Sequence, residues 1–165
     1  MELVILRHGE AGNRSPSASK DFERGLTASG RKEIEDVAKS INGLKLVFDK
    51  IATSPLTRAR ETAEIVAKVM KKQKDLEVWD ELKPEGETAD LYRRLSKLKG
   101  ESCVLLVGHE PYLSGMISEL ISGGKRSRIL LKKGGMAKVD VDSLASRPSG
   151  VLRWLLTPRQ IKKMS

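Results

Sequence analysis

The chain has 165 residues and is strongly basic, with 31 Lys and Arg against 22 Asp and Glu, a net charge of +9. A chain of this length buries roughly 70% of its unfolded surface, and its composition of 39% apolar but 4% aromatic residues predicts one domain over residues 1–165 with a mostly aliphatic core. No segment approaches the ~20 apolar residues that span a bilayer, the apolar run at the N-terminus is too short for a signal peptide, and the single Cys103 excludes an internal disulfide. We therefore expect a soluble cytoplasmic protein.

Apolar β-branched runs alternate with segments of helical period, a pattern typical of an α/β domain. The runs Leu3–Leu6 and Val104–Val107 lack polar alternation and predict strands covered on both faces. Met136–Val141 alternates, which predicts a half-exposed strand near the sheet edge after a turn at "KKGG". The predicted strands are, in chain order, Glu2–Leu6, Lys50–Ala52, Leu76–Trp79, Cys103–Val107, Arg128–Leu131, Met136–Val141 and Val151–Leu156.

Apolar residues three and four apart, together with capping residues, predict four helices. The first follows a Thr27 cap and ends at Gly43, the second has Ser54 as cap and Pro55 at its first position, the third begins near Thr88, and the fourth runs from Pro111 to Gly123.

The two histidines of the chain occupy equivalent places, each directly after an apolar strand and beside a glycine. Ligands of an open α/β sheet bind at the carboxyl ends of its strands, so His8 and His109 meet across one crevice if their strands are neighbours. A lone histidine is most often a packed or surface residue. Here that interpretation would have to hold twice, so we favour a shared site.

Arginines complete this candidate site. "TSPLTRARETA" places Arg58 in the first turn of a helix, where free N–H groups and the helix dipole favour anions. Arg60 lies on the opposite face, four residues before Glu64, and is interpreted as a surface ion-pair partner. Arg7 supplies a second planar guanidinium suited to phosphate oxygens.

Two histidines with at least two arginines indicate phosphoryl chemistry, because arginines neutralise phosphate oxygens and a neutral imidazole can attack phosphorus. The pairs His8 with Glu10 and His109 with Glu110 could hold a metal, but the adjacent guanidinium groups would repel a dication. Cys103 lies within an apolar strand and is interpreted as a core residue.

The motifs "LRHGEA", "SPLTRARETA" and "VGHEP", with "RGLTASGRKEI", resemble the histidine phosphatase superfamily, also called phosphoglycerate-mutase-like. "DELKPEG" and "LLKKGGMAKVD" are most similar to its SixA-type phosphohistidine phosphatase group. The resemblance covers nearly the whole chain. It implies a three-layer α/β/α sandwich with a largely parallel sheet, and it implies no metal or other cofactor.

Carried over motif by motif, the resemblance implies that His8 is the phosphorylated nucleophile. Arg7, Arg58 and His109 would hold the phosphoryl group, and Arg24 resembles a further pocket arginine, with an exposed loop charge as the alternative. The family often draws a general acid from the segment after the third strand, where Glu81 is the candidate among the neighbouring carboxylates Asp80, Glu85 and Glu87. Asn13 falls one residue earlier than a family asparagine and is assigned no role.

The function expected from these residues is a phosphatase that acts on phosphohistidine in a protein through a covalent intermediate on His8. No long insertion is present to form a lid, and an open basic pocket suits a phosphate displayed on a protein. The alternatives are a phosphatase or mutase for small phosphorylated metabolites, and a non-catalytic phosphate-binding module. Lysine runs without interleaved aromatic residues predict no nucleic-acid partner, and we expect a monomer without membrane contact.

Overall fold

A computed structural model describes residues 1–98, 102–125 and 127–164, and it is built around one mixed six-stranded sheet with the order β3-β2-β4-β1-β5-β6. The pairs β3–β2, β2–β4 and β4–β1 are parallel, whereas β1–β5 and β5–β6 are antiparallel. The strands are β1 (Glu2–Arg7), β2 (Lys50–Thr53), β3 (Leu76–Val78), β4 (Cys103–Gly108), β5 (Met136–Ser143) and β6 (Ser149–Leu156).

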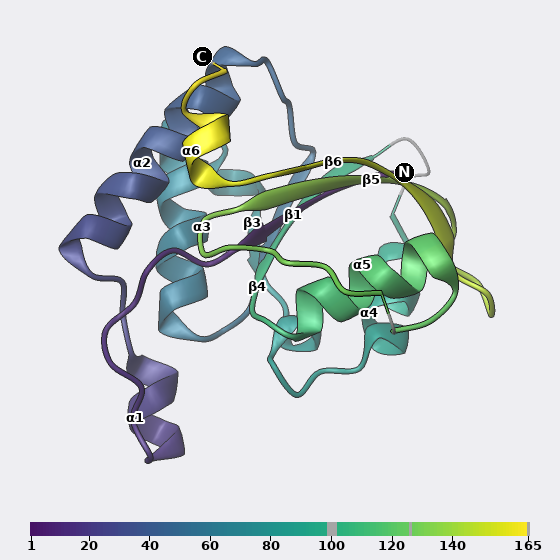
Figure 1. Ribbon diagram of the computed structural model, residues 1–165, viewed down its shortest axis with the longest axis horizontal. Coiled ribbons are helices and arrows are strands. Elements are labelled where there is room, and N and C mark those ends of the chain that lie inside the picture. The colour runs from purple at the N-terminus through teal and green to yellow at the C-terminus, as the bar shows by residue number, and fades with distance from the viewer. Residues whose placement is uncertain (99–101, 126, 165) are drawn as a thin grey trace.

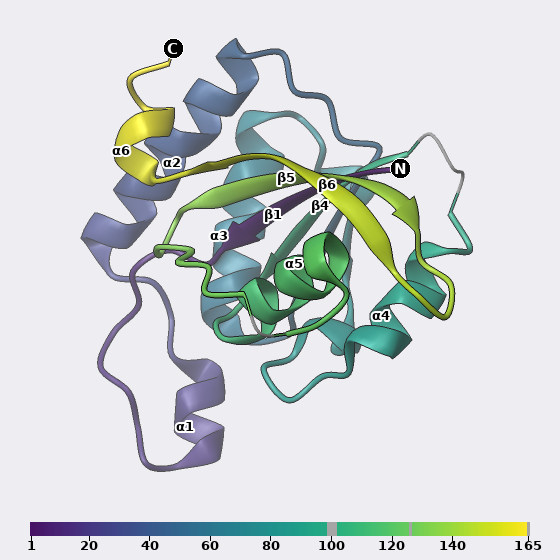
Figure 2. The same cartoon turned by 45° about the vertical axis from the view of Figure 1, so that its right-hand side comes forward.

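Helices cover both faces of the sheet, which confirms the predicted three-layer α/β/α sandwich (Figure 1). One face packs against α2 (Ala28–Gly43), α3 (Thr57–Val69) and α6 (Pro158–Ile161), and the other against α4 (Thr88–Leu95) and α5 (Tyr112–Ser122). The short helix α1 (Ala18–Glu23) projects from this body in both views (Figures 1 and 2). Single 3-10 turns span Gln73–Asp75 and Asp80–Leu82. Among the described residues, no helix has the length and apolarity needed to cross a membrane.

The central strand β1 supplies both halves of the core. Leu3 and Ile5 belong to the core beneath α4 and α5, and Val4 and Leu6 to the core beneath α2 and α3. All four side chains are fully buried, as the unbroken apolar run predicts.

The predicted strand Arg128–Leu131 is wrong, because the structure has no strand there. Both edges of β1 are already paired with β4 and β5, so this segment cannot pair with the central strand β1. Leu131 is buried in the core, and Leu130 is exposed. β5 itself pairs with β1 and β6, so β6 and not β5 forms the free edge on this side.

The helix caps are correct in part. Thr27 is the N-cap of α2 as predicted, and its side chain accepts a hydrogen bond from the Gly30 N–H. Ser54, however, is not the cap of α3, which begins at Thr57 after Leu56. The short helices α1 and α6 were not predicted, since neither is long enough to show a helical period.

The N-terminus of α2 supports the loop that follows β1. The Glu10 carbonyl accepts a hydrogen bond from the Thr27 N–H at 3.0 Å. A Cβ atom on Gly30 would lie 2.2 Å from the same carbonyl oxygen. The Leu-Thr-x-x-Gly segment therefore combines a helix cap with a glycine that lets the loop after β1 approach closely.

Gly30→Ala should lower the free energy of unfolding by about 2 kcal/mol, because overpacking against backbone outweighs the helix propensity that alanine gains. Gly124→Ala is the control, since a Cβ there meets nothing within 4 Å. Denaturant unfolding of the two variants checks this. Equal stability of both would contradict the role assigned to Gly30.

Candidate active site

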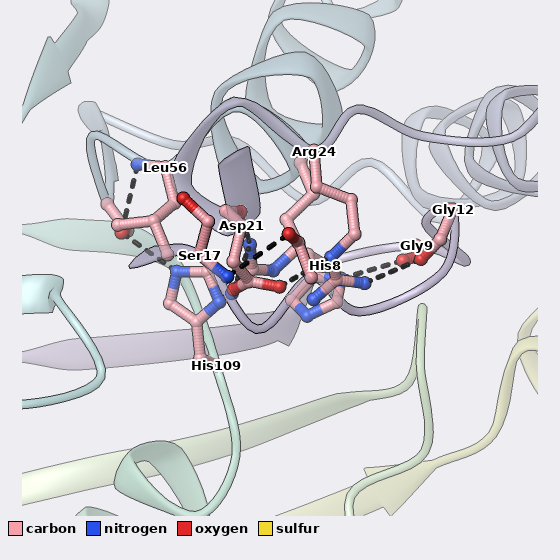
Figure 3. Close-up of polar contacts among 11 residues, drawn as sticks. His8, Gly9, Gly12, Ser17, Asp21, Arg24, Leu56 and His109 are labelled. Carbon is pink, nitrogen blue, oxygen red and sulfur yellow. Dashed lines mark hydrogen bonds and ion pairs between the residues drawn. The ribbon is translucent and has the colours of Figure 1, made fainter. Parts of the chain in front are cut away.

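The parallel pairing of β1 with β4 brings the two histidines together. Arg7 lies opposite Gly108 in the ladder, and the His8 N–H donates a hydrogen bond to the Gly108 carbonyl at 3.0 Å. The imidazole rings of His8 and His109 lie with their centroids 5.1 Å apart, and 6% and 2% of the two residues are exposed. Figure 3 shows both rings beside Asp21 and Arg24. The two strand ends thus form one site, as their placement in the sequence predicts.

The His8 ring is held in a defined tautomer. Its Nδ1 atom lies 2.7 Å from the Gly9 carbonyl oxygen. Since a carbonyl can only accept, Nδ1 carries the proton and Nε2 keeps its lone pair. The Gly9 N–H in turn donates to Thr62 Oγ1 at 3.1 Å, and the Thr62 hydroxyl donates to the Arg58 carbonyl at 2.7 Å. This chain of bonds fixes His8 relative to α3.

Three arginines from different elements are anchored by oxygen atoms around this ring. Arg58, in the first turn of α3, is 5% exposed and donates from Nη1 to the Asp21 carbonyl at 2.9 Å. Arg7, at the end of β1, donates to the Leu131 carbonyl at 2.9 Å. Arg24 donates from Nη1 to the Gly12 carbonyl at 2.9 Å and from Nε to the Asp21 carboxylate at 3.0 Å.

These residues line one hollow of about 500 Å³ at the carboxyl ends of β1 and β4. In the described part of the chain, Arg7 Nε, Arg58 Nε and His109 Nδ1 are buried without a hydrogen-bond partner. Buried polar atoms without a partner are rare, and oxygen atoms of a bound anion would satisfy the N–H groups of the two arginines. The lining residues are Arg7, His8, Glu10, Ala11, Gly12, Asn13, Arg14, Arg24, Arg58, Pro84, His109, Glu110 and Lys133.

Both histidines are neutral at physiological pH. Burial lowers the pKa of His8 most, and the Arg58, Arg7 and Arg24 charges lower it further, to about 4, although the bond to Gly9 opposes the shift. Burial also lowers the pKa of His109, with His8, Arg58 and Arg24 adding to the effect, to about 3. A neutral His8 offers a nucleophilic nitrogen without prior deprotonation.

The structure does not bring Glu81 to this hollow. Its carboxylate accepts hydrogen bonds from Arg94 at 3.0 and 3.2 Å and lines a separate hollow of about 780 Å³. The carboxylates that do line the site are Glu10 and Glu110. Glu10 accepts a hydrogen bond from the Ser29 hydroxyl, and Glu110 from the Ser114 N–H. The expectation that Glu81 is the general acid therefore has no support in this geometry.

Other expectations from the sequence can now be placed. Arg60 lies 3.6 Å from Glu64 in an exposed pair, as predicted. Cys103 begins β4 and is only partly buried. Asn13 lines the hollow although no role was assigned to it. Within the described residues, no three His, Cys, Asp or Glu side chains gather as metal ligands.

Three residues that touch the site were missed. Ser54, interpreted as a helix cap, lies with its Oγ 2.8 Å from His109 Nε2. Thr62 lies within α3, and Asp21 lies on α1, which was not predicted. A polar residue directly after β2 was a signal for Ser54, because β2 pairs with β4 and ends at the same edge. No local pattern marks the other two.

Comparisons with known proteins show which family the chain belongs to. The model of the histidine phosphatase superfamily (branch 1) matches residues 3–88. A protein of Picosynechococcus sp. named as uncharacterized is 35% identical over 138 residues, 82% of each chain. The chain belongs to the histidine phosphatase superfamily.

Two further similarities of this histidine phosphatase concern SixA proteins. The phosphohistidine phosphatase SixA of Escherichia coli is 28% identical over 164 residues, which cover 98% of this chain and 97% of the relative. A solved structure of the protein histidine phosphatase SixA complexed with tungstate superposes with a TM-score of 0.84 at 28% identity, covering 96% of this chain and 98% of the other.

The lowered pKa values of this histidine phosphatase can be measured directly, because His8 and His109 are the chain's two histidines. Imidazole NMR should show both rings still neutral at pH 5.5, where a histidine with the ordinary pKa of about 6.5 is mostly protonated. His109→Gln assigns the resonances. A pKa between 6 and 7 for either ring would contradict the description of the site. Because the unfolded chain takes up protons first, the free energy of unfolding should also fall as pH decreases from about 6.5 towards the folded values.

Proposed function

We propose that this histidine phosphatase removes the phosphoryl group from phosphohistidine in a protein through a covalent intermediate on His8. The observation that carries the proposal is the free Nε2 of His8. Its ring is fixed by the Gly9 carbonyl and set among Arg7, Arg58 and His109. A binding module needs the arginines but not an oriented, neutral imidazole, so the arrangement favours catalysis.

The proposed reaction has two displacements at phosphorus. In the first, the other nitrogen of the substrate imidazole carries a proton from solvent, the His8 Nε2 lone pair forms the new P–N bond, and the bond to the substrate nitrogen breaks. The substrate imidazole keeps that electron pair and leaves as a neutral ring. In the second, the oxygen of water forms a bond to phosphorus while the P–N bond to His8 breaks and its electron pair returns to Nε2. The water proton passes to solvent, and inorganic phosphate leaves. Arg7, Arg24 and Arg58 would neutralise the oxygens that carry charge in each transition state.

His109 is proposed as a donor to the phosphoryl oxygens. In the free protein, burial lowers the pKa of His109 most, and His8 and the surrounding arginines lower it further. A bound phosphoryl dianion brings negative charge beside the ring and raises the pKa of His109, because an opposite charge favours the protonated form. Ser54 Oγ, at 2.8 Å from Nε2, orients the ring. His109 would thus become cationic when the substrate binds.

The carboxylates support phosphohistidine over a phosphate ester as the substrate. An alkoxide leaving group needs a strong general acid, and the structure turns Glu81 towards Arg94 instead. A neutral imidazole is a far better leaving group and asks less of an acid. The name of the Escherichia coli relative, phosphohistidine phosphatase, adds support for this substrate class.

Charges at the mouth of the hollow support a protein as the partner. Arg14 and Lys133 line it, are exposed, and belong to none of the ion pairs between described residues. Free cations around an anion site attract acidic surface beyond the phosphoryl group itself.

The covalent step is tested by trapping. Brief incubation with radiolabelled phosphoramidate and rapid quenching should leave an acid-labile, base-stable label on the wild type and none on His8→Ala. Glu81→Gln should label like the wild type, because its carboxylate lies outside the hollow. Turnover of the donor by His8→Ala at the wild-type rate would exclude the covalent route. Loss of label in Glu81→Gln would restore that residue as a catalytic candidate.

The substrate class is tested by substituting the exposed cations at the mouth of the hollow. Arg14→Gln and Lys133→Gln should each lower kcat/KM for a phosphohistidine-bearing protein by about fivefold, or ~1 kcal/mol, and change that for phosphoramidate less. Lys132→Gln is the matched control, because Lys132 is exposed in the same segment and does not line the hollow. Equal losses with both substrates would contradict a protein partner. A small phosphate ester that is hydrolysed better than phosphohistidine would favour the metabolite phosphatase.

A further inference from the structure

Asp21 joins two of the arginines that line the phosphate pocket. Its carboxylate accepts a hydrogen bond from Arg24 Nε at 3.0 Å and lies 3.5 Å from Arg58 Nη1. The same Arg58 nitrogen donates to the Asp21 carbonyl at 2.9 Å. One residue therefore holds both guanidinium groups, through its side chain and its main chain. Figure 3 shows Asp21 beside Arg24.

The segment from Ala11 to Leu26 carries Asp21. The two ends of this segment pair with each other, and Asp21 connects its helix α1 to Arg58. Ala11 pairs with Leu26 in an isolated bridge, and the Gly12 N–H donates to the Gly25 carbonyl. α1 buries none of its own residues. In the described part of the chain, the hydrogen bonds that α1 makes outside residues 12–25 come from Arg58 to Asp21.

The contact of Asp21 with Arg24 and Arg58 offsets the positive charge of these two arginines. Burial lowers the pKa of the Arg58 guanidinium, the Arg24 charge lowers it further, and Asp21 opposes both. Desolvation alone would raise the pKa of Asp21, but the hydrogen bond and charge of Arg24 and the charge of Arg58 bring it below the ordinary value. Two like charges at one pocket repel each other, and a shared carboxylate offsets that repulsion.

We propose that Asp21 is a positioning residue that holds Arg24 and Arg58 together in the geometry that binds the phosphoryl group. The inference rests on the proposed function only in requiring that the pocket bind a phosphoryl oxyanion. Asp21 does not touch the reacting atoms in this role. It replaces solvent as the partner of both arginines, so that neither has to be ordered when the substrate arrives.

The direction in which phosphate affinity changes when the Asp21 carboxylate is removed distinguishes a positioning role from a simple effect of charge. A carboxylate close to the pocket also repels phosphate, so an Asp21 that contributed charge alone would weaken binding, and its removal would tighten it. Positioning predicts the opposite. Asp21→Asn keeps an oxygen that can accept from Arg24 but removes the charge, and Asp21→Ala removes both.

The test is a calorimetric titration of inorganic phosphate and of vanadate, which requires no turnover. Asp21→Asn should bind both anions about tenfold more weakly than the wild type, and Asp21→Ala more weakly still. Glu23→Gln is the matched control on the same exposed helix and should stay within about twofold of the wild type. Thermal unfolding of each variant shows whether the fold is retained.

A double-mutant cycle shows that the effect passes through the arginine. In an Arg24→Gln background, Asp21→Asn should cost much less affinity than in the wild type, because the group it positions is gone. A merely structural role would give the same loss in both backgrounds and would overturn the proposal. Unchanged or tighter binding by Asp21→Asn would also overturn it while leaving the proposed function intact. Absence of phosphate and vanadate binding to the wild type would overturn both.

Discussion

The parallel pairing of β1 with β4 is the contact on which the site depends, because it places Arg7 opposite Gly108 and so sets the residues that follow each strand side by side. The register is held by apolar side chains buried on both faces of these strands. A shift by one residue would exchange the two faces of β1 and turn its core residues the wrong way. The distance between the imidazoles of His8 and His109 is therefore a consequence of how the core packs.

Charge is balanced around these two rings without a metal-ligand cluster among the described residues. Burial and the neighbouring arginines lower the pKa of both histidines, which leaves two uncharged imidazoles inside a cationic pocket. A phosphoryl dianion would reverse this field and allow His109 to take up a proton. Asp21 is the acidic group that faces two of the arginines, so the free pocket already contains part of the charge that a substrate supplies.

Three glutamates near the carboxyl ends of the strands lie in two separate hollows, and their positions decide which of them can act on a bound phosphoryl group. Glu81 pairs with Arg94 in a hollow of its own, whereas Glu10 and Glu110 line the histidine site and accept hydrogen bonds from Ser29 and Ser114. Glu81, the general-acid candidate from the sequence, therefore lies outside the histidine site. A site of this kind suits the transfer of a phosphoryl group from nitrogen, and the exposed cations at its mouth suit a phosphate that is part of a larger molecule.

Apolar periodicity and the residues at strand ends are local signals, and they were enough to predict an α/β domain and a shared site of Arg7, His8, Arg58 and His109 if the strands of the two histidines are neighbours. The three-layer sandwich was predicted from the resemblance of the motifs to a known family. It also contained an unused signal for α6, the capping box of Thr157 and Gln160. The remaining features of the site follow from long-range packing. Arg128–Leu131 forms no strand although its sequence favours one, and Glu81 turns to Arg94, which the spacing of the loop does not show. Asp21 reaches Arg58 across 37 positions, and such a contact depends on how the whole chain packs.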